Sequence, residues 1–278
     1  MQSRDFAQVD VFTSTAYLGN PLAVVLNADG LSTEEMQQFA NWTNLSETSF
    51  LFAPTSDEAD YRVRIFTPST ELAFAGHPTL GSCHAWLTNG GVPKRSNLIV
   101  QECDAGLVRV QRSGDGLAFA APALSRSGAV DDLTLEKLVR ILGIEPDDVV
   151  DSQWVDNGPG WVGVLLGDAD AVLALRPSFV EDLDVGVVGM HRAGSAFAYE
   201  VRGFFAKDGH TTEDPVTGSL NASLAQWLLA CGRVDAPYVA RQGTALGRAG
   251  HVAITCDDDG DVWVGGHTVT CVRGTVYL

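Results

Sequence analysis

The stretch Glu213–Ser219 (EDPVTGS) is a near copy of an earlier stretch, Gly76–Ser82 (GHPTLGS). In both, a polar residue is followed by proline, two further residues and Gly-Ser, and an apolar segment with helical spacing comes next. Proline suits the first turn of a helix, where its missing N–H would have no partner anyway. The N–H groups at a helix start can also bind an anion. The two copies therefore predict two similar helix N-termini, one carrying His77 and the other Asp214, which form two halves of one site.

Further matches place these stretches within a longer internal repeat. Three pairs of segments recur in the same order about 138 residues apart, and a shared offset indicates a duplication. The pairs are Tyr61–Phe66 with Tyr199–Phe204, His77-Pro78 with Asp214-Pro215, and Asn20-Pro21 with Gly158-Pro159. We expect two similar domains, residues 1–121 and 122–265, and a final strand, 266–278, that returns to the first domain.

Length, charge and cysteine usage exclude several classes of protein. A chain of 278 residues with 45% apolar residues fits two domains with real cores, and it contains no apolar run long enough to span a membrane. A net charge of −17 argues against nucleic acid or an anionic membrane as partner. The first residues carry no apolar signal core, so a cytoplasmic protein is expected. Five scattered cysteines predict neither a metal site nor disulfides, and we expect no cofactor.

Local patterns predict a mixture of strands and helices. Ser32–Glu35 is a capping box that begins a helix ending near Trp42, and a helix over Thr134–Leu142 ends at Gly143. Two more helices follow the proline motifs. The expected strands are 7–13, 22–26, 49–53, 61–66, 97–102, 106–112 and 116–120 in the first half, and 161–166, 250–256, 261–265 and 268–276 in the second.

Two catalytic motifs are disfavoured. Gly158–Gly163 fits the dinucleotide-binding pattern, but a strand-like run follows it where that fold needs a helix. Ser219, His77 and Asp214 could form a hydrolase triad. However, the chain lacks the Gly-x-Ser-x-Gly turn that exposes a nucleophilic serine, and a serine in the first turn of a helix is better placed to bind.

Three motifs taken together resemble the phenazine-biosynthesis PhzF-like family. They are Asn44–Thr48 (NLSET), Phe74–Pro78 (FAGHP) and Glu213–Ser219. The turn at Gly19–Pro21 and the order of the strands agree, so the resemblance covers essentially the whole chain. It implies the diaminopimelate epimerase-like fold, an α+β fold of two pseudo-symmetric domains. In that fold each domain wraps a mostly antiparallel sheet round a central helix, and the active-site cleft lies between the domains.

The same resemblance implies the residues of the site and a homodimer. The catalytic residues would be Glu47, His77 and Asp214, the substrate carboxylate would be held by Gly218 and Ser219, and Gly76 would line the cleft. Many members have a small residue after this serine. Here Leu220 follows it, and we expect it to narrow the pocket.

Relatives that epimerise diaminopimelate use two cysteines, one at each helix start, whereas the corresponding places here, 75–77 and 213–215, hold no thiol. A carboxylate and an imidazole remain, which suits moving a proton within one face of a substrate. We therefore expect a cofactor-independent isomerase of a small carboxylate-bearing metabolite, with Glu47 carrying the proton. An amino-acid epimerase or racemase on the same fold, or a non-catalytic small-molecule binding protein, stays open as an alternative.

Overall fold

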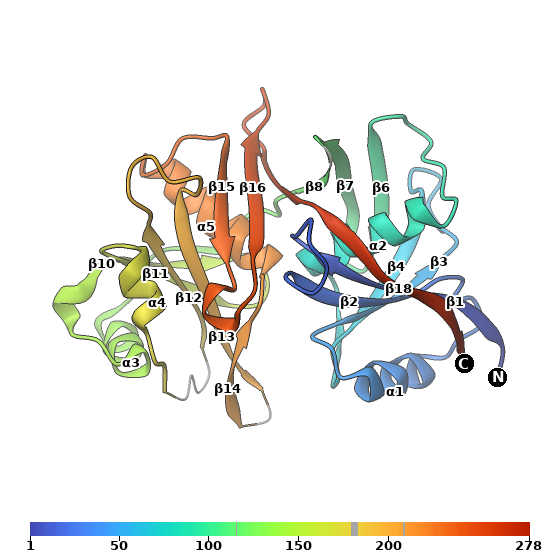
Figure 1. Cartoon of the computed structure of the whole chain (residues 1–278), viewed down its shortest axis with the longest axis horizontal. Helices are drawn as coiled ribbons and strands as arrows, with labels where there is room; N and C mark the ends of the chain where they lie inside the picture. The colour runs from blue at the N-terminus through green and yellow to red at the C-terminus, as the bar shows by residue number, and fades with distance from the viewer. Residues whose placement is uncertain (115, 179–182, 208) are drawn as a thin grey trace. The chain divides into compact units, whose positions relative to one another are not determined.

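The structure is a computed structural model that describes residues 1–114, 116–178, 183–207 and 209–278. Its contacts divide the chain into two compact units (Figure 1). Unit 1 comprises Met1–Ala120 and Gly265–Leu278, and unit 2 comprises Ala121–Val264. In the described part of the chain, no helix is both long and apolar enough to cross a membrane.

Unit 1 contains nine strands and two helices in its described residues. The strands are β1 (Ser3–Val11), β2 (Asn20–Val25), β3 (Thr48–Phe52), β4 (Tyr61–Phe66), β5 (Glu71–Leu72), β6 (Leu98–Cys103), β7 (Gly106–Ser113), β8 (Gly116–Ala120) and β18 (Thr268–Tyr277). The helices are α1 (Thr33–Thr43) and α2 (Gly76–Thr88). β18, from the C-terminus, pairs with β1, so the last strand closes the sheet of the first unit.

Unit 2 repeats this plan. Its strands are β9 (Arg126–Ala129), β10 (Val149–Asp156), β11 (Trp161–Leu166), β12 (Asp184–Met190), β13 (Tyr199–Lys207), β14 (His210–Asp214), β15 (Tyr238–Gln242), β16 (Gly250–Cys256) and β17 (Val262–Gly266, the last two residues of which belong to unit 1). Its helices are α3 (Asp132–Leu142), α4 (Ala169–Ala174) and α5 (Gly218–Ala230), with short 3-10 turns at Pro146–Asp148 and Thr244–Leu246.

Both sheets are mostly antiparallel. The parallel exceptions are β2–β3 and β4–β6 in unit 1 and, at matching places, β11–β12 and β13–β15 in unit 2. In each unit one helix is buried within the sheet: α2 packs against β1, β2, β3, β6, β8 and β18, and α5 packs against β10 and β16. A helix that is apolar or small on every side is stable only when it is buried in this way. The predicted α+β architecture is therefore confirmed.

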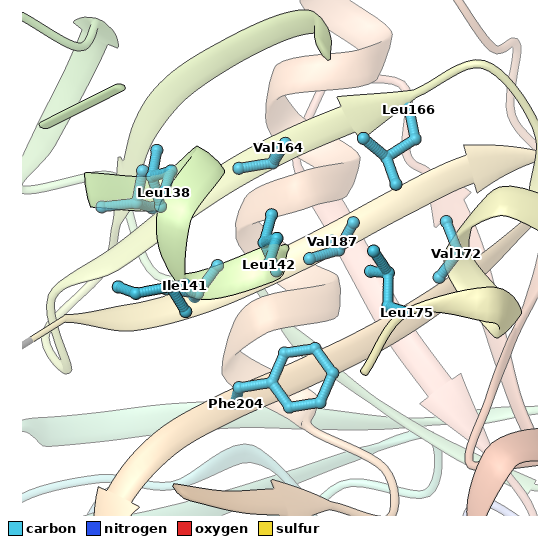
Figure 2. Close-up of a cluster of buried hydrophobic side chains, with 11 residues drawn as sticks. Leu138, Ile141, Leu142, Val164, Leu166, Val172, Leu175, Val187 and Phe204 are labelled. Carbon is cyan, nitrogen blue, oxygen red and sulfur yellow. The ribbon is translucent and has the colours of Figure 1, made fainter. Parts of the chain in front are cut away.

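The outer faces of the sheets are covered as well. Figure 2 shows Leu138, Ile141 and Leu142 of α3 packed against Val187 of β12 and Phe204 of β13. In unit 1, side chains of α1 cover β3 in the same way. Strands that are buried on both faces have nearly continuous apolar sequences. This explains why apolar and polar residues do not alternate cleanly along such strands.

The repeat register becomes clear at one hairpin. In unit 1, Phe66 pairs with Glu71, and in unit 2, Phe204 pairs with Glu213. Only residues 67–70 separate the first pair, whereas residues 205–212 separate the second. The offset between equivalent residues therefore rises from about 138 before the hairpin to about 142 after it.

This register corrects the predicted match between His77 and Asp214. α2 begins at Gly76 and α5 at Gly218, so that His77 and Ser219 are each the second residue of the helix. Pro78 lies in the first turn of α2 as predicted, but Pro215 precedes α5, so the same prediction for Pro215 was wrong. Asp214 is the last residue of β14 rather than part of a helix start, because the longer hairpin shifts the chain along the motif.

Candidate active site

In unit 1, three segments that are distant in the sequence meet at the start of α2. His77 is buried there, and its Nε2 lies 3.4 Å from Oε2 of Glu47. Its Nδ1 lies 3.4 Å from Nδ2 of Asn20, the buried first residue of β2. The Gly-Asn-Pro, Asn-Leu-Ser-Glu-Thr and Ala-Gly-His-Pro stretches thus meet round one imidazole, and Gly76 begins the helix that carries it.

Local sequence places Glu47 at this point. Asn44 ends α1 in the left-handed region, at φ 53°, a conformation that asparagine tolerates better than most residues. The chain then turns and enters β3 at Thr48, so Glu47 lies directly before a strand. Its side chain is 17% exposed, against 5% for that of His77. The Glu47 side chain is therefore the more accessible of the two.

Burial lowers the pKa of His77 to about 3. The imidazole is therefore neutral at physiological pH, and its contact with Glu47 joins a neutral ring to a carboxyl group rather than two opposite charges. A neutral imidazole offers one N–H donor and one acceptor nitrogen. Nδ1 lies next to the Asn20 amide nitrogen, and a ring hydrogen bond to the Pro21 backbone opposes the fall in pKa. The ring is thus held between the start of β2 and Glu47.

In unit 2, a buried polar network precedes α5. Thr217 donates a 2.7 Å hydrogen bond from Oγ1 to Oδ2 of Asp214. Gln242 of β15 donates to Thr217 Oγ1 and to the Asp214 carbonyl, at 3.0 and 3.2 Å, and its own Oε1 accepts from Asn221 at 2.7 Å. All four residues are buried. The network fixes the turn between β14 and α5 and therefore the orientation of Asp214.

The first turn of α5 carries the residues expected to hold a carboxylate. Thr217, the residue before the helix, makes no side-chain cap, since its hydroxyl group is bonded to Asp214. Ser219 Oγ accepts a 3.1 Å hydrogen bond from Nε1 of Trp161, and the Ser219 carbonyl accepts one of 2.9 Å from Asn157. A hydroxyl that accepts from an indole still has its own O–H to donate. Together with the N–H of Gly218, this O–H can bind an anion.

Leu220 does not narrow a pocket as expected. It is fully buried, and a Cβ on Gly186 would lie 2.2 Å from its Cδ1. The side chain therefore packs under the glycines of β12 and β13. Cys83, at the inner side of α2, is also buried, and burial raises its pKa to about 12, as expected for a packing residue.

The predicted residues fall into two sets. Glu47, Gly76 and His77 belong to unit 1, and Asp214, Gly218 and Ser219 belong to unit 2. Asn20, Trp161, Thr217 and Gln242 were missed as site residues. Asn20 had a signal in its Gly-Asn-Pro motif, which was interpreted as a turn and as part of the repeat but not as part of the site. The strand that carries Gln242 had none. Among the described residues, no three His, Cys, Asp or Glu side chains are grouped closely enough to hold a metal ion.

Comparison with known proteins shows similarity along nearly the whole chain. Residues 9–274 match the family described as phenazine biosynthesis-like protein. The chain is 36% identical to antisense-enhancing sequence 1 of Schizosaccharomyces pombe, with 100% of both chains covered. It is 31% identical to trans-2,3-dihydro-3-hydroxyanthranilate isomerase of Pseudomonas fluorescens, with 99% of each covered. A PhzF-family crystal structure from Bacillus anthracis shares the fold, with a TM-score of 0.84 at 23% identity over 100% of both chains.

Proposed function

The chain belongs to the phenazine biosynthesis-like family, and we propose that it moves a proton within a small carboxylate-bearing metabolite, with Glu47 as the proton carrier. The chain is an isomerase, because several relatives that are at least 30% identical over nearly their whole length are named as isomerases. The observation that carries the finer proposal is the 3.4 Å contact between His77 Nε2 and Glu47 Oε2 at the start of a buried helix.

The charge state of His77 supports the choice of Glu47 as the proton carrier. An imidazole with a pKa of about 3 is a weaker base than an ordinary carboxylate, whose pKa is about 4. His77 therefore serves as a hydrogen-bonding partner, to Glu47 or to a polar group of the substrate. The Glu47 side chain is the more exposed of the two, so it is the group proposed to meet the substrate proton.

The reaction needs neither cofactor nor redox partner. The Glu47 carboxylate takes a proton from a substrate carbon next to an unsaturated or carboxylate-bearing carbon, and the electron pair of the broken C–H bond moves into the conjugated system. Glu47, now a carboxylic acid, then gives the proton to another carbon of that system on the same face. The new C–H bond replaces the old one, and a double bond has moved.

The substrate carboxylate is proposed to bind at the start of α5. The partial positive charge of a helix N-terminus, the N–H of Gly218 and the hydroxyl of Ser219 all favour an anion there. Trp161 holds Ser219 Oγ by the 3.1 Å hydrogen bond described above, which orients the hydroxyl. Asp214 is proposed to assist from its buried network with Thr217.

Solvent isotope exchange tests the proposal. The first substrate to try is trans-2,3-dihydro-3-hydroxyanthranilate, followed by other small cyclic or unsaturated carboxylates and by amino acids. In D2O, NMR should show a shifted double bond without inversion of a stereocentre. Deuterium should enter the newly protonated carbon to the extent that the Glu47 acid exchanges its proton with solvent before it returns it. Exchange with inversion would indicate an epimerase instead. Binding with neither a shifted double bond nor exchange would indicate a non-catalytic binding protein, and either result contradicts the proposal.

A homodimer is proposed from the family resemblance alone. Light scattering should then give a mass of about twice 29.6 kDa, and a mass corresponding to one chain contradicts it.

A further inference from the structure

Glu47 has a counterpart in unit 2. It directly precedes the residue of β3 that pairs with Phe66. The equivalent residue of β12 pairs with Phe204, and Asp184 directly precedes that residue. Since Phe66 and Phe204 occupy the same position in the repeat, Asp184 stands in unit 2 where Glu47 stands in unit 1. The two units therefore carry a carboxylic acid at the same position of the repeat.

Asp184 also faces the buried helix of its unit. Successive strand residues point to opposite faces, so Asp184 and Gly186 share one face of β12. A Cβ on Gly186 would lie 2.2 Å from Leu220 of α5, which identifies this face as the one towards α5. Val185 and Val187 point the other way, into the cluster of Figure 2.

Trp161, the neighbour of Asp184 on the next strand, contacts the expected carboxylate site. Trp161 of β11 lies beside Asp184 in the parallel register, and its indole donates to Ser219 Oγ. Ser219 is the second residue of α5, as His77 is of α2. In unit 1, the acid before a strand, Glu47, contacts the second residue of the buried helix, His77. The equivalent positions in unit 2 are Asp184 and Ser219 in the first turn of α5.

The surroundings of Asp184 favour its protonated form. Burial raises its pKa to about 6, and the nearby Asp156 carboxylate adds to the rise. Burial acts to raise the pKa of Asp156 too, but hydrogen bonds from the N–H groups of Gly158 and Gly160 lower it overall, so Asp156 stays ionised. Within the described ranges, no cation forms an ion pair with Asp184, and no donor hydrogen-bonds to its carboxyl group.

We propose that Asp184 is a second acid of the active site, which holds a proton and donates it in a hydrogen bond to the substrate carboxylate at the start of α5. This role rests on the proposed function, because it assumes that a carboxylate binds at Gly218 and Ser219. When a substrate carbon conjugated to that carboxylate loses its proton, negative charge spreads onto the carboxylate, and a fixed donor stabilises the charge. Carboxylic acids kept neutral by their surroundings can supply such a donor.

Two substitutions of Asp184 distinguish the effect of its hydrogen-bond donor from the effect of its negative charge. Asp184→Asn keeps an N–H donor and cannot ionise, whereas Asp184→Leu has similar bulk and no donor. The matched control is Asp170→Asn on α4, whose carboxylate is exposed and pairs with the surface residue Arg192. Benzoate is the binding probe, measured by calorimetry at about pH 5 on the full chain, where Asp184 is mostly protonated. Circular dichroism checks that each variant is folded.

Asp184→Asn and the control should bind benzoate at least as tightly as the wild type, whereas Asp184→Leu should bind it about tenfold or more weakly, as expected for a lost hydrogen bond to a charged group. With a turned-over substrate, Asp184→Leu should raise KM and lower kcat. If Asp184→Leu fails to fold, the pH dependence of benzoate binding to the wild type and to Asp184→Asn tests the proposal instead. Wild-type affinity should fall as pH rises above about 6, and Asp184→Asn should lose that dependence.

The outcomes distinguish this inference from the proposed function. Wild-type benzoate affinity in Asp184→Leu, or equal losses in both variants, overturns the role of Asp184 even if Glu47→Gln is inactive. No benzoate binding to the wild-type chain also overturns it, because the role requires a carboxylate site. Normal turnover in Glu47→Gln, with the expected Asp184 results, overturns the proton carrier and leaves Asp184 in place.

Discussion

Nε2 of His77 lies 3.4 Å from Oε2 of Glu47, and the imidazole is neutral because burial lowers its pKa to about 3. A cation at that place would hold the carboxyl group in its ionised form. A neutral ring can hydrogen-bond to the carboxylate without opposing its protonation to the same extent. A group that must both accept and release a proton needs such surroundings, since both of its protonation states must be accessible.

Glu47→Gln should lower kcat by about 10²–10⁴-fold and leave substrate affinity within a few-fold, because the amide keeps the shape and hydrogen bonding of the side chain but cannot carry a proton. Steady-state kinetics and deuterium exchange measure this. The control is Glu58→Gln, an exposed residue of the same unit. His77→Ala and Asp214→Asn should lose less activity than Glu47→Gln. Near-normal exchange in Glu47→Gln rejects the mechanism.

The buried imidazole should make stability fall at acid pH. The unfolded chain protonates His77 near pH 6.5, whereas the folded chain resists protonation down to about pH 3. Stability from this group is therefore complete above pH 6.5 and is lost as pH falls towards 3. Between pH 7 and 4.5, wild type should lose on the order of 3 kcal/mol more than His77→Gln. Urea unfolding of both proteins at the two pH values measures the difference, and parallel losses contradict it.

Ser219→Ala should raise KM more than it lowers kcat, because the hydroxyl is proposed to bind a carboxylate that is present in both the ground state and the transition state. Kinetics of the variant against Ser127→Ala, an exposed serine of β9, test this. Trp161→Phe, which removes the indole donor to Ser219, should change KM in the same direction by a smaller factor. An unchanged KM in Ser219→Ala is the contrary result.

The two equivalent ion pairs of the repeat should differ in their contributions to stability. Arg202 and Glu213 form a two-bond contact at 2.9 and 2.8 Å with side chains only 6% and 11% exposed, whereas Arg64 and Glu71 are each 25% exposed. Glu213→Gln leaves a buried guanidinium without its counter-charge and should cost about 3–5 kcal/mol. Glu71→Gln should cost about 1 kcal/mol. Equal losses in denaturant unfolding contradict the role of burial.

Activity should survive EDTA and extensive dialysis. The five cysteines are scattered along the sequence, which also carries no phosphate-binding loop, and the proposed proton transfer needs no Lewis acid. The measurement is turnover before and after chelation, with the dialysed enzyme as a second sample. Loss of turnover that an added metal ion restores would contradict this prediction.

Much of the local structure followed from short sequence signals. The capping box at Ser32 and Glu35 is present with both of its hydrogen bonds, and Gly143 ends α3 at φ 66°. The strand predicted at 250–256 is β16. Such features depend on the hydrogen bonding and backbone freedom of a few neighbouring residues, so the sequence is sufficient to predict them.

Other elements gave no such signal. One of them is β12, the strand that begins at Asp184, which was not predicted. Its sequence is a short apolar run broken by glycines, and those glycines are required by close approach rather than by a turn. A Cβ on Gly189 would lie 2.2 Å from the Asp168 carbonyl oxygen. The partner that excludes the side chain belongs to another element, and a local pattern contains no information about it.

By itself, the sequence determined the duplication, the α+β architecture and the three motifs that carry Glu47, His77 and Asp214. Only the tertiary structure decided which residues of the repeat are equivalent. Motif similarity matched His77 with Asp214, whereas strand pairing matches His77 with Ser219 and Glu47 with Asp184. Strand pairing depends on contacts between distant segments and on the length of the hairpin between them. The neutral state of His77 was decided in the same way, because desolvation comes from every element packed round the ring.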